Sequence, residues 1–257
     1  MAARKSRAFA LVHEDEDVVV VDKAPGVLTV PTPRRERFTL VDEVSRYLSR
    51  GPRITKEAFV VHRLDRETSG LVVFGKSPRA RDRLCERWTE HERSYAAVVA
   101  GVVVDDEGTI TSRLVTDERS LTRRSSGSDD GEEAITRFVV QARLDGATLL
   151  SVVLQTGRRN QIRVHLRERG HPILGDDRYG GLGRHRRWDD RRLGLHAQVL
   201  GFAQPRTLQP LRFDTGLPPD FRTFLAAAAS TAARAAPRAP AQDRPPPRPR
   251  DHGARRR

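Results

Sequence analysis

A charged segment at residues 62–71, HRLDRETSGL, contains the first side chains that could do chemistry. Asp65 stands between two arginines, and the small residues Thr68-Ser69-Gly70 that follow would allow a ligand or a second backbone to come close. Burial can raise the pKa of a carboxyl group by about 3–5 units, so a buried aspartate that works as an anion needs a cation beside it. The segment therefore indicates either a reacting carboxylate or an aspartate that caps its own turn.

A second segment, QTGRRNQIRVH at residues 155–165, brings three arginines together with Asn160 and Gln161 where a strand gives way to a helix. The free N–H groups and the positive end of a helix entrance suit anions. Arg163 falls on the helix itself, where its planar guanidinium could hold a carboxylate in one orientation. The segment predicts an anion-binding site, and a solvated basic helix face is the alternative interpretation.

Tyrosine and histidine side chains are the remaining candidates. Tyr95 opens an apolar strand, so its ring can belong to the core or stack on a base. His62, His165 and His196 lack the local spacing of metal ligands, which predicts histidines that make hydrogen bonds within the fold. The glycines of GGLG at residues 180–183 match neither a phosphate loop nor a dinucleotide fingerprint.

The net charge of the chain is +13, with a sequence pI near 11.1, which indicates an anionic partner and most readily a nucleic acid. Residues 226–257 hold eight arginines and two aspartates, so +6 of this charge lies at the C-terminal end and +7 in the body of the chain. The charge by itself therefore favours nucleic-acid binding without locating it.

The composition excludes several classes of protein. No apolar run approaches the roughly 20 residues that cross a bilayer, and the first residues do not resemble a secretory signal. The one cysteine, Cys85, can form neither an internal disulfide nor a metal site built on paired cysteines, and a lone thiol suits the reducing cytoplasm. We therefore expect a cytoplasmic protein that has no membrane segment.

Apolar periodicity predicts a mixed α/β (α+β) fold with a largely antiparallel central sheet, because strands and helices do not alternate strictly. Helices are expected at residues 39–48, at 77–94 and at 160–172. Strands are expected within residues 9–23 (two strands, the second at Val18–Val21) and at 59–64, 70–76, 94–104, 134–144, 147–157 and 192–205. The polar residues 123–133 predict an exposed loop.

This pattern predicts a single domain at residues 9–227, preceded by a short N-terminal extension at residues 1–8. From about Ala228 the sequence is rich in alanine, proline and arginine and has little to bury. Residues 228–257 are therefore expected to be a disordered tail.

Five sequence blocks together resemble the RluA-type RNA pseudouridine synthases, from about Phe9 to Phe224. The blocks are HEDEDVVVVDKAPGVLTVP, HRLDRETSGLVVFGKS, ERSYAAVVAG, QTGRRNQIRVHLRERGHPILGDDRYG and RLGLHAQVLGFAQP, and the HRLD-x-x-TSG block is specific to this family. The resemblance implies the pseudouridine synthase fold, whose helices and loops flank the sheet around an RNA-binding cleft. It also implies an isomerase that converts uridine to pseudouridine without a cofactor or a metal. We expect a monomer whose partner is RNA, either tRNA or rRNA.

The same resemblance implies roles for individual residues. Asp65 matches the catalytic aspartate, Arg163 the arginine paired with it, and Tyr95 the tyrosine whose ring packs against the target base. Arg63 matches a position that can take the place of the extruded base. The residues expected to contact RNA are Arg63, Arg66, Arg158, Arg159, Asn160 and Gln161.

Asn160 departs from the family pattern, in which this position is usually histidine. No S4-type RNA-binding module is expected before residue 9, which favours tRNA or small rRNA elements over 23S rRNA. Two other classes of function are considered: a noncatalytic RNA-binding or assembly factor that keeps the fold, and a retaining glycosidase. The first is disfavoured because Asp65, Tyr95 and Arg163 occur together. The second would require two carboxylates about 5–5.5 Å apart, and the sequence offers Asp65 only Glu67, from the same turn.

Overall fold

One sheet of 11 strands organises the part of the chain that the computed structural model describes, which is residues 7–32, 38–49, 53, 55–117, 122–180, 185–189 and 191–235. The strand order is β1-β2-β4-β10-β5-β9-β8-β6-β7, with β11 beside β10 and β3 beside β4. Within this described part, β4 and β10 are the one pair of strands that run parallel. The predicted mixed fold with a largely antiparallel sheet is confirmed.

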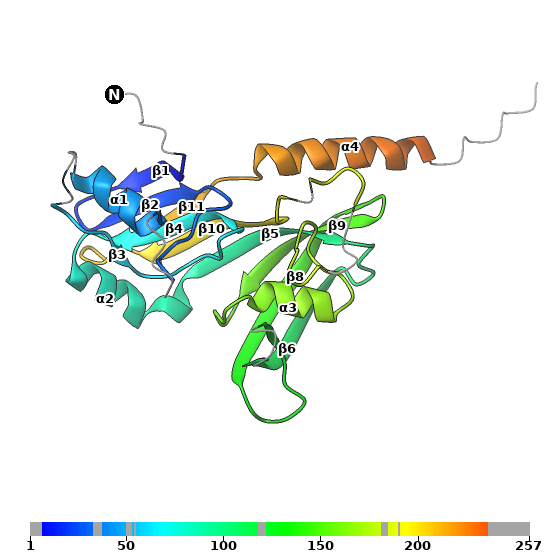
Figure 1. The fold of residues 1–257 in the computed structure, drawn as a ribbon, viewed down its shortest axis with the longest axis horizontal. Helices are drawn as coiled ribbons and strands as arrows, with labels where there is room; N and C mark the ends of the chain where they lie inside the picture. Colours follow the sequence, from blue (N-terminus) through cyan, green and yellow to red (C-terminus); the bar gives the residue numbers. More distant parts are fainter. Residues whose placement is uncertain are drawn as a thin grey trace, which may run out of the picture.

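The sheet has two connected halves, with β1, β2, β4, α1 and α2 at one end and β5, β6, β8, β9 and α3 at the other (Figure 1). The strands are β1 (Phe9–Glu14), β2 (Val18–Lys23), β3 (Phe59–Val60), β4 (Ser69–Gly75), β5 (Glu92–Ala100), β6 (Glu107–Thr116), β7 (Arg123–Ser125), β8 (Glu132–Leu144), β9 (Ala147–Leu154), β10 (Leu195–Ala203) and β11 (Pro210–Asp214). The helices are α1 (Leu40–Ser49), α2 (Pro78–Glu86), α3 (Gln161–Glu168) and α4 (Pro219–Ala235), with a 3₁₀ turn, η1, at Trp88–Glu90.

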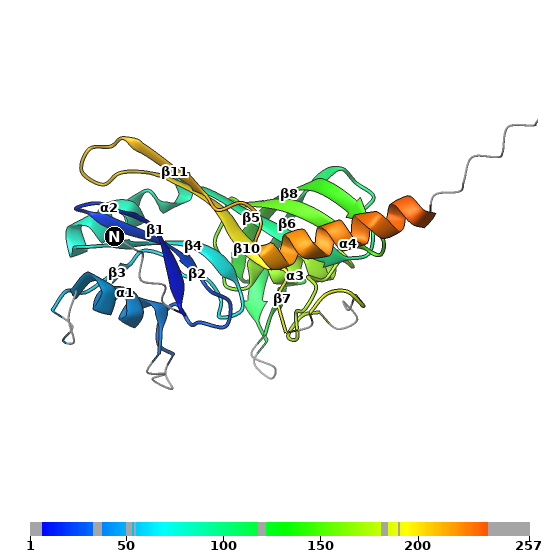
Figure 2. The ribbon, with the colours of Figure 1, turned by 90° about the horizontal axis from the view of Figure 1, so that it is seen from above.

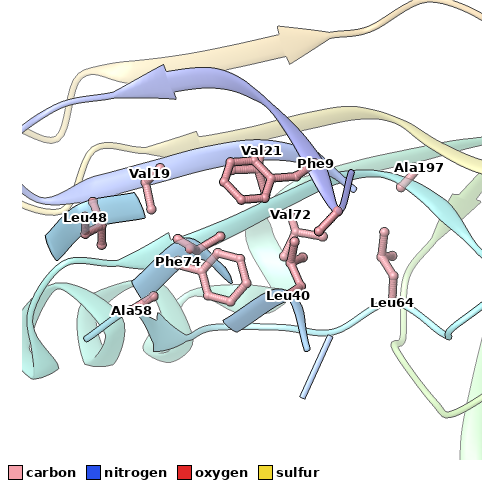
Figure 3. Close-up of a cluster of buried hydrophobic side chains, with 12 residues drawn as sticks. Phe9, Val19, Val21, Leu40, Leu48, Ala58, Leu64, Val72, Phe74 and Ala197 are labelled. Carbon is pink, nitrogen blue, oxygen red and sulfur yellow. The ribbon is translucent and has the colours of Figure 1, made fainter. Parts of the chain in front are cut away.

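In the first half, both faces of β2 are buried, and this explains the unbroken run of valines in that strand. Because successive side chains of a strand point to opposite faces, Val19 and Val21 pack under α1, whereas Val18 and Val20 pack toward Leu84 of α2. Figure 3 shows the α1 side of this core, where Leu64 lies one residue before Asp65. The charged segment is therefore anchored in the core next to its candidate carboxylate.

The second half is covered by α3 on one face and by α4 on the other. Ile162 and Leu166 of α3 pack on β5, β8 and β9, as their spacing of four residues predicts. Phe221 and Phe224 of α4 pack with Trp188 on the opposite face of the same strands, and Figure 2 shows α4 running over this half. Helix α3 is thus held rigidly, and its N-terminal end faces the junction of the two halves.

Helix α4 corrects the predicted start of the tail. The backbone is helical to Ala235, so the expectation of disorder is wrong for residues 228–235, and Ala228 is buried beside Phe224. Pro219 at the start and the alanines that follow favour a helix. Ala8, which was assigned to the N-terminal extension, is fully buried. The other residues of the predicted extension and tail, except Arg7, lie outside the described residues.

Most predicted elements are confirmed, with local corrections. The residues expected to form a strand at 59–64 do so only at Phe59–Val60, because the chain then turns into the charged segment. The expected loop at 123–133 contains a short strand, Arg123–Ser125, and the start of β8. Ser77 caps α2 by accepting a hydrogen bond from the Ala80 N–H, as expected. None of the described helices is both long and apolar enough to cross a lipid bilayer.

The parallel contact between β4 and β10 fixes where the charged segment ends. Gly70 lies opposite Ala197 of β10, and Ala197 in turn lies opposite Tyr95 of β5. Gly70 has a φ of +116°, and a Cβ at this position would overlap the Ala197 backbone. The glycine therefore allows β4 to approach β10, and this approach brings the residues just before β4 close to Tyr95.

A buried hydrogen-bond network ties the same junction together. Arg192 Nη2 donates to Ser69 Oγ at 2.7 Å, and Ser69 Oγ lies 2.8 Å from His196 Nδ1. Burial lowers the pKa of His196 to about 4, so the ring is neutral. Because the Thr215 hydroxyl donates to the Gln198 carbonyl, it accepts from His196 Nε2–H at 2.9 Å, and Nδ1 then accepts from the Ser69 hydroxyl. This network holds the start of β4 in place.

Candidate active site

A cavity of about 350 Å³ opens where the charged segment, β5 and the entrance of α3 meet. Eight of the nine site residues expected from the sequence line this cavity: Arg63, Asp65, Tyr95, Arg158, Arg159, Asn160, Gln161 and Arg163. Arg66 is exposed and does not line it. Residues that are about 100 positions apart in the chain therefore share one site.

The Asp65 carboxylate faces a cation, as the argument from burial requires. Arg163 Nη1 lies 3.4 Å from Asp65 Oδ2 and 3.6 Å from Glu67 Oε2. The Arg163 side chain is 6% exposed and that of Asp65 is 23% exposed, so water screens this pair only weakly. The carboxylate is thus directed toward Arg163, and the interpretation of Asp65 as a simple turn cap is not supported.

Arg163 has a second and closer partner that the sequence did not reveal. Its Nε and Nη2 donate to the two oxygens of Asp176 at 2.8 and 2.7 Å, a two-pronged pair in which the Asp176 side chain is 1% exposed. Asp176 also accepts hydrogen bonds from the backbone N–H groups of Arg178 and Tyr179. Arg163 thus contacts three acids, Asp65, Glu67 and Asp176, and the sequence argument considered only the first two. Asp176 orients Arg163 through these hydrogen bonds but does not line the cavity. It therefore cannot serve as the second carboxylate of a glycosidase.

Asn160 contacts Asp65 directly. Its backbone has a φ of 57°, a left-handed conformation that asparagine tolerates better than most residues. The amide must place its oxygen toward the Tyr179 hydroxyl at 3.0 Å, because the opposite orientation would press that oxygen against the carboxylate. The amide nitrogen then lies 3.1 and 2.6 Å from the two Asp65 oxygens. Asn160 is thus a hydrogen-bond donor to Asp65, and the RNA contact expected of it from the sequence stays a prediction.

Tyr179 links this contact to the rest of the fold. Its hydroxyl accepts a hydrogen bond from the Arg123 N–H at 2.9 Å, so it can donate its own proton to the Asn160 oxygen. The Arg163 guanidinium lies over the same ring, 5.1 Å from the centroid. One tyrosine therefore orients both groups that hold Asp65. The sequence reasoning missed it, although the block ILGDDRYG contained both Tyr179 and Asp176.

The pKa values of this cluster follow from burial and charge. Burial raises the pKa of Asp65, while the charge and hydrogen bond of Arg163 oppose this rise. For Arg163, burial lowers the pKa, but Asp176 together with Asp65 and Glu67 outweighs burial and the net pKa is raised, so the guanidinium stays charged. The Asn160 amide adds a donor that favours the Asp65 anion. The site thus combines a poorly solvated carboxylate with fixed donors, an arrangement suited to a reacting anion.

Tyr95 faces the cavity from β5. Burial raises the pKa of its hydroxyl to about 12, so the phenol is neutral and can donate a hydrogen bond but is a poor base. Its ring packs between two of the core clusters, which leaves its orientation little freedom. A rigid, half-buried ring beside a carboxylate is suited to hold a flat ligand.

Three arginines form the rim of the cavity, and Gln161 plays a different part. Arg63, Arg158 and Arg159 are exposed and line the opening, where they can meet phosphates. Gln161 is 2% exposed. Its amide donates to Ile135 O and Thr136 Oγ1 and accepts from Thr156 Oγ1 and the Arg158 N–H. Gln161 therefore positions the α3 entrance, and its expected contact with RNA stays a prediction.

Lys23 also stabilises the charged segment, and the sequence reasoning did not identify it. The side chain is completely buried, and Nζ donates to the carbonyl oxygens of Ala24, Val27 and Arg66 at 2.8–3.0 Å. Burial lowers the pKa of Lys23 to about 7, and the charges of Glu67 and Asp65 act against this. Three acceptors match the three N–H bonds of an ammonium, so Lys23 connects two loops when it is protonated.

The histidines behave as the sequence predicted. His165 is fully buried between Ser112 and Thr136, and His196 belongs to the network at β4. His62 accepts a hydrogen bond from the Val73 N–H and stacks on Trp88. Across the described ranges, no group of three or more His, Cys, Asp or Glu side chains could hold a metal ion.

Comparisons with known proteins agree with the geometry. A family model described as RNA pseudouridylate synthase matches residues 17–168. YlyB of Bacillus subtilis, described as an uncharacterized RNA pseudouridine synthase, is 35% identical over 219 residues, which are 84% of this chain and 71% of that protein. The ribosomal large subunit pseudouridine synthase D of Xanthomonas campestris is 33% identical over 249 residues, covering 91% and 74% of the two chains.

A solved structure, human RNA pseudouridylate synthase domain containing 1, superposes with a TM-score of 0.68 at 25% identity, over 92% of this chain and 99% of that one. The chain therefore belongs to the RNA pseudouridylate synthase family, whose members are isomerases. The RluA-type resemblance and the pseudouridine synthase fold expected from the sequence are confirmed.

Proposed function

We propose that this enzyme converts particular uridines of structured RNA, in tRNA or rRNA, to pseudouridine, with Asp65 as the reacting carboxylate. The observation that carries the proposal is the Asp65 anion held by Arg163 and Asn160 inside a cavity that Tyr95 also lines. Asp65, Arg163, Asn160 and Tyr95 meet within one chain, and we also propose that the enzyme works as a monomer.

The reaction breaks the bond between N1 of uracil and C1′ of the ribose and forms a bond from C5 to C1′. The hydrogen on C5 is lost as a proton, and N1 gains one, so no atoms are added overall. Asp65 can attack C1′ or remove the 2′ proton, and both routes need an ionised carboxylate beside the sugar in a place poor in water. The neutral Tyr95 packs against the uracil and can donate a hydrogen bond to one of its carbonyl oxygens.

The uridine must leave its stack before Asp65 can reach C1′. Flipping a nucleotide costs a few kcal/mol. The exposed arginines of the rim can offset this through contacts with phosphates. Arg63, which lines the cavity, is proposed to fill the space left by the extruded base. Charge on the rim is therefore part of the catalytic function rather than a surface property alone.

The relatives give limited guidance on the RNA target. The name of the Xanthomonas campestris protein favours large-subunit rRNA, and that of the Bacillus subtilis protein specifies no particular RNA. We also propose that the enzyme works in the cytoplasm, since its free Cys85 thiol is exposed and suits a reducing compartment.

Pseudouridine mapping of total RNA from cells with and without this gene tests the proposal and identifies the target. We expect one or a few uridines, at defined positions, that are modified only when the gene is present. Reintroduction of the wild-type gene should restore these positions. An unchanged pseudouridine map in both strains would refute the proposed function.

A further inference from the structure

Arg93 is a buried cation that has no role in the proposed chemistry. It lies on β5 two residues before Tyr95, lines the same cavity and is 5% exposed. Its one hydrogen bond within the described residues runs from Nη2 to the Leu154 carbonyl at 3.3 Å, and its buried Nε has no partner. A guanidinium carries five N–H donors, so most of the hydrogen-bonding capacity of Arg93 is unused.

No carboxylate among the described residues forms an ion pair with Arg93. This distinguishes it from Arg163, which is buried to a similar degree but has two oxygens of Asp176 at hydrogen-bond distance. Burial lowers the pKa of Arg93, and the neighbour that acts against this is Tyr95, whose hydroxyl is neutral. A buried charge with no counter-ion is unfavourable, which indicates that a ligand supplies the anion.

The surroundings of Arg93 keep its position fixed and its charge uncompensated. The guanidinium lies over the Trp88 ring, 5.3 Å from the centroid, and His62 stacks on the same ring at 4.4 Å. Burial, with the charge of Arg93 as a further cause, lowers the pKa of His62 to about 3 and that of His91 to about 4. Both rings are therefore neutral, and neither adds a positive charge beside Arg93.

His62 contributes a second donor. Its Nε2 accepts the Val73 N–H at 3.1 Å, so the proton of the neutral ring sits on Nδ1. Within the described residues Nδ1 has no hydrogen-bond partner, and His62 lines the cavity beside Arg63. A guanidinium and an imidazole N–H that line one cavity match the oxygens of a phosphate group.

We propose that Arg93, together with the Nδ1–H of His62, binds a backbone phosphate of the RNA next to the uridine that is held at Asp65. This inference rests on the proposed function, because it assumes that a nucleotide occupies the cavity. It adds a phosphate subsite inside the cavity, separate from the exposed arginines of the rim, and it gives the wall formed by Trp88, His62 and Arg93 a part in orienting the sugar.

The test compares ligands that differ only in phosphate. Isothermal titration of the full-length enzyme uses three probes: uridine 3′,5′-bisphosphate, uridine, and an analogue of the bisphosphate in which methylphosphonates reduce the charge. The wild type should bind the bisphosphate at least tenfold more tightly than uridine, and the methylphosphonate analogue should lose most of this advantage. Arg93→Gln should bind uridine within twofold of the wild type and lose the preference for the bisphosphate. Arg93→Lys should keep part of that preference.

Arg137→Gln is the matched control, since Arg137 is exposed on β8 and does not line the cavity. It should keep the full preference for phosphate. Equal binding of uridine and its bisphosphate by the wild type, or failure of the wild type to bind the bisphosphate at millimolar concentration, would overturn the proposal. So would an Arg93→Gln variant that keeps the preference, or one that loses uridine and bisphosphate alike, which would indicate a contact with the base.

Thermal melting checks that each variant is folded, and the methylphosphonate comparison needs no variant. Pseudouridine formation is measured separately on the wild type. An active enzyme with no preference for phosphate would remove this subsite and leave the proposed function in place. A protein that binds the bisphosphate through Arg93 but forms no pseudouridine would remove the proposed function and leave the phosphate subsite in place.

Discussion

Replacing Asp176 by asparagine should strongly destabilise the fold, although Asp176 does not line the cavity. The substitution removes the charge that faces Arg163 at 2.7 and 2.8 Å and turns an N–H group toward its donors. Arg163 is then left with Asp65 at 3.4 Å and Glu67 at 3.6 Å. Breaking a buried ion pair by removing one partner costs about 3–5 kcal/mol.

For a chain of this size, 1 kcal/mol changes the melting temperature by about 2–4 °C. We therefore expect Asp176→Asn to lower Tm by roughly 6–20 °C. Differential scanning calorimetry or denaturant titration measures the effect. Asp105→Asn is the matched control, because Asp105 forms an exposed pair with Arg169 at 3.4 Å and such pairs contribute only about 0–1 kcal/mol.

Asp65→Asn provides the contrast that tests the reasoning. Burial raises the pKa of Asp65 in the folded protein. A carboxyl group with a raised folded pKa favours the fold below its unfolded pKa, and this contribution is lost as the pH rises through the folded pKa. Above its unfolded pKa the group thus disfavours the fold relative to a neutral side chain, so its replacement by asparagine should leave the unfolding free energy at neutral pH unchanged or raise it. The account of this ion-pair cluster would be refuted if Asp176→Asn melted within a degree of the wild type, or if Asp65→Asn were the more destabilising change.

Three further perturbations test other parts of the site and fold. Asn160→Ala removes a hydrogen bond to a charged group, which contributes about 1.5–3 kcal/mol, so kcat should fall roughly 10- to 100-fold. Because the pKa of Asp65 rises when this donor is lost, the acid limb of the pH–rate profile should move to higher pH, and an unmoved limb would contradict the contact. Gly70→Ala should destabilise the protein by at least about 2 kcal/mol more than Gly26→Ala, since both positions have positive φ but only Gly70 would clash, with the Ala197 backbone; equal losses in denaturant titration would argue against the tight β4–β10 approach. Removal of residues 228–257 should lower Tm more than removal of residues 236–257, because only the longer deletion takes away the buried Ala228, and equal melting curves would show that the end of α4 adds no stability.

Sequence reasoning identified the residues whose local context is distinctive. Asp65 stands out as an acid among arginines ahead of Thr68-Ser69-Gly70, and Arg163 as an arginine at a helix entrance. Both lie in the cavity. The elements that position them could also be predicted where apolar residues recur with a clear period, as in α1 and α3.

The missed parts depend on contacts that local spacing does not encode. Asp176 meets Arg163 because the chain after α3 folds back on that helix, and its position 13 residues further on does not reveal this. Strand β6 was overlooked because its side chains are mostly polar and only Leu114 is buried. Helix α4 could have been predicted from Phe221, Phe224 and Ala228, which fall on one helical face, but the alanine and proline content of the segment suggested disorder instead.

Asn160 shows how a departure from a family pattern gains meaning only in three dimensions. From the sequence it is an asparagine where histidine is usual, and it was expected to contact RNA. In the fold its amide donates to both oxygens of Asp65, and Tyr179 fixes its orientation. The residue type that suits a left-handed backbone also supplies the hydrogen-bond donor.

The most direct test of the central claim is pseudouridine formation by the purified Asp65→Asn enzyme on the RNA that mapping identifies, with RNA affinity measured on the same preparation. We expect no product above background and a Kd within about twofold of the wild type, because the substitution removes the reacting anion and leaves the basic rim and Arg93 intact. Product formed at a rate near that of the wild type would show that the chemistry does not depend on the Asp65 carboxylate.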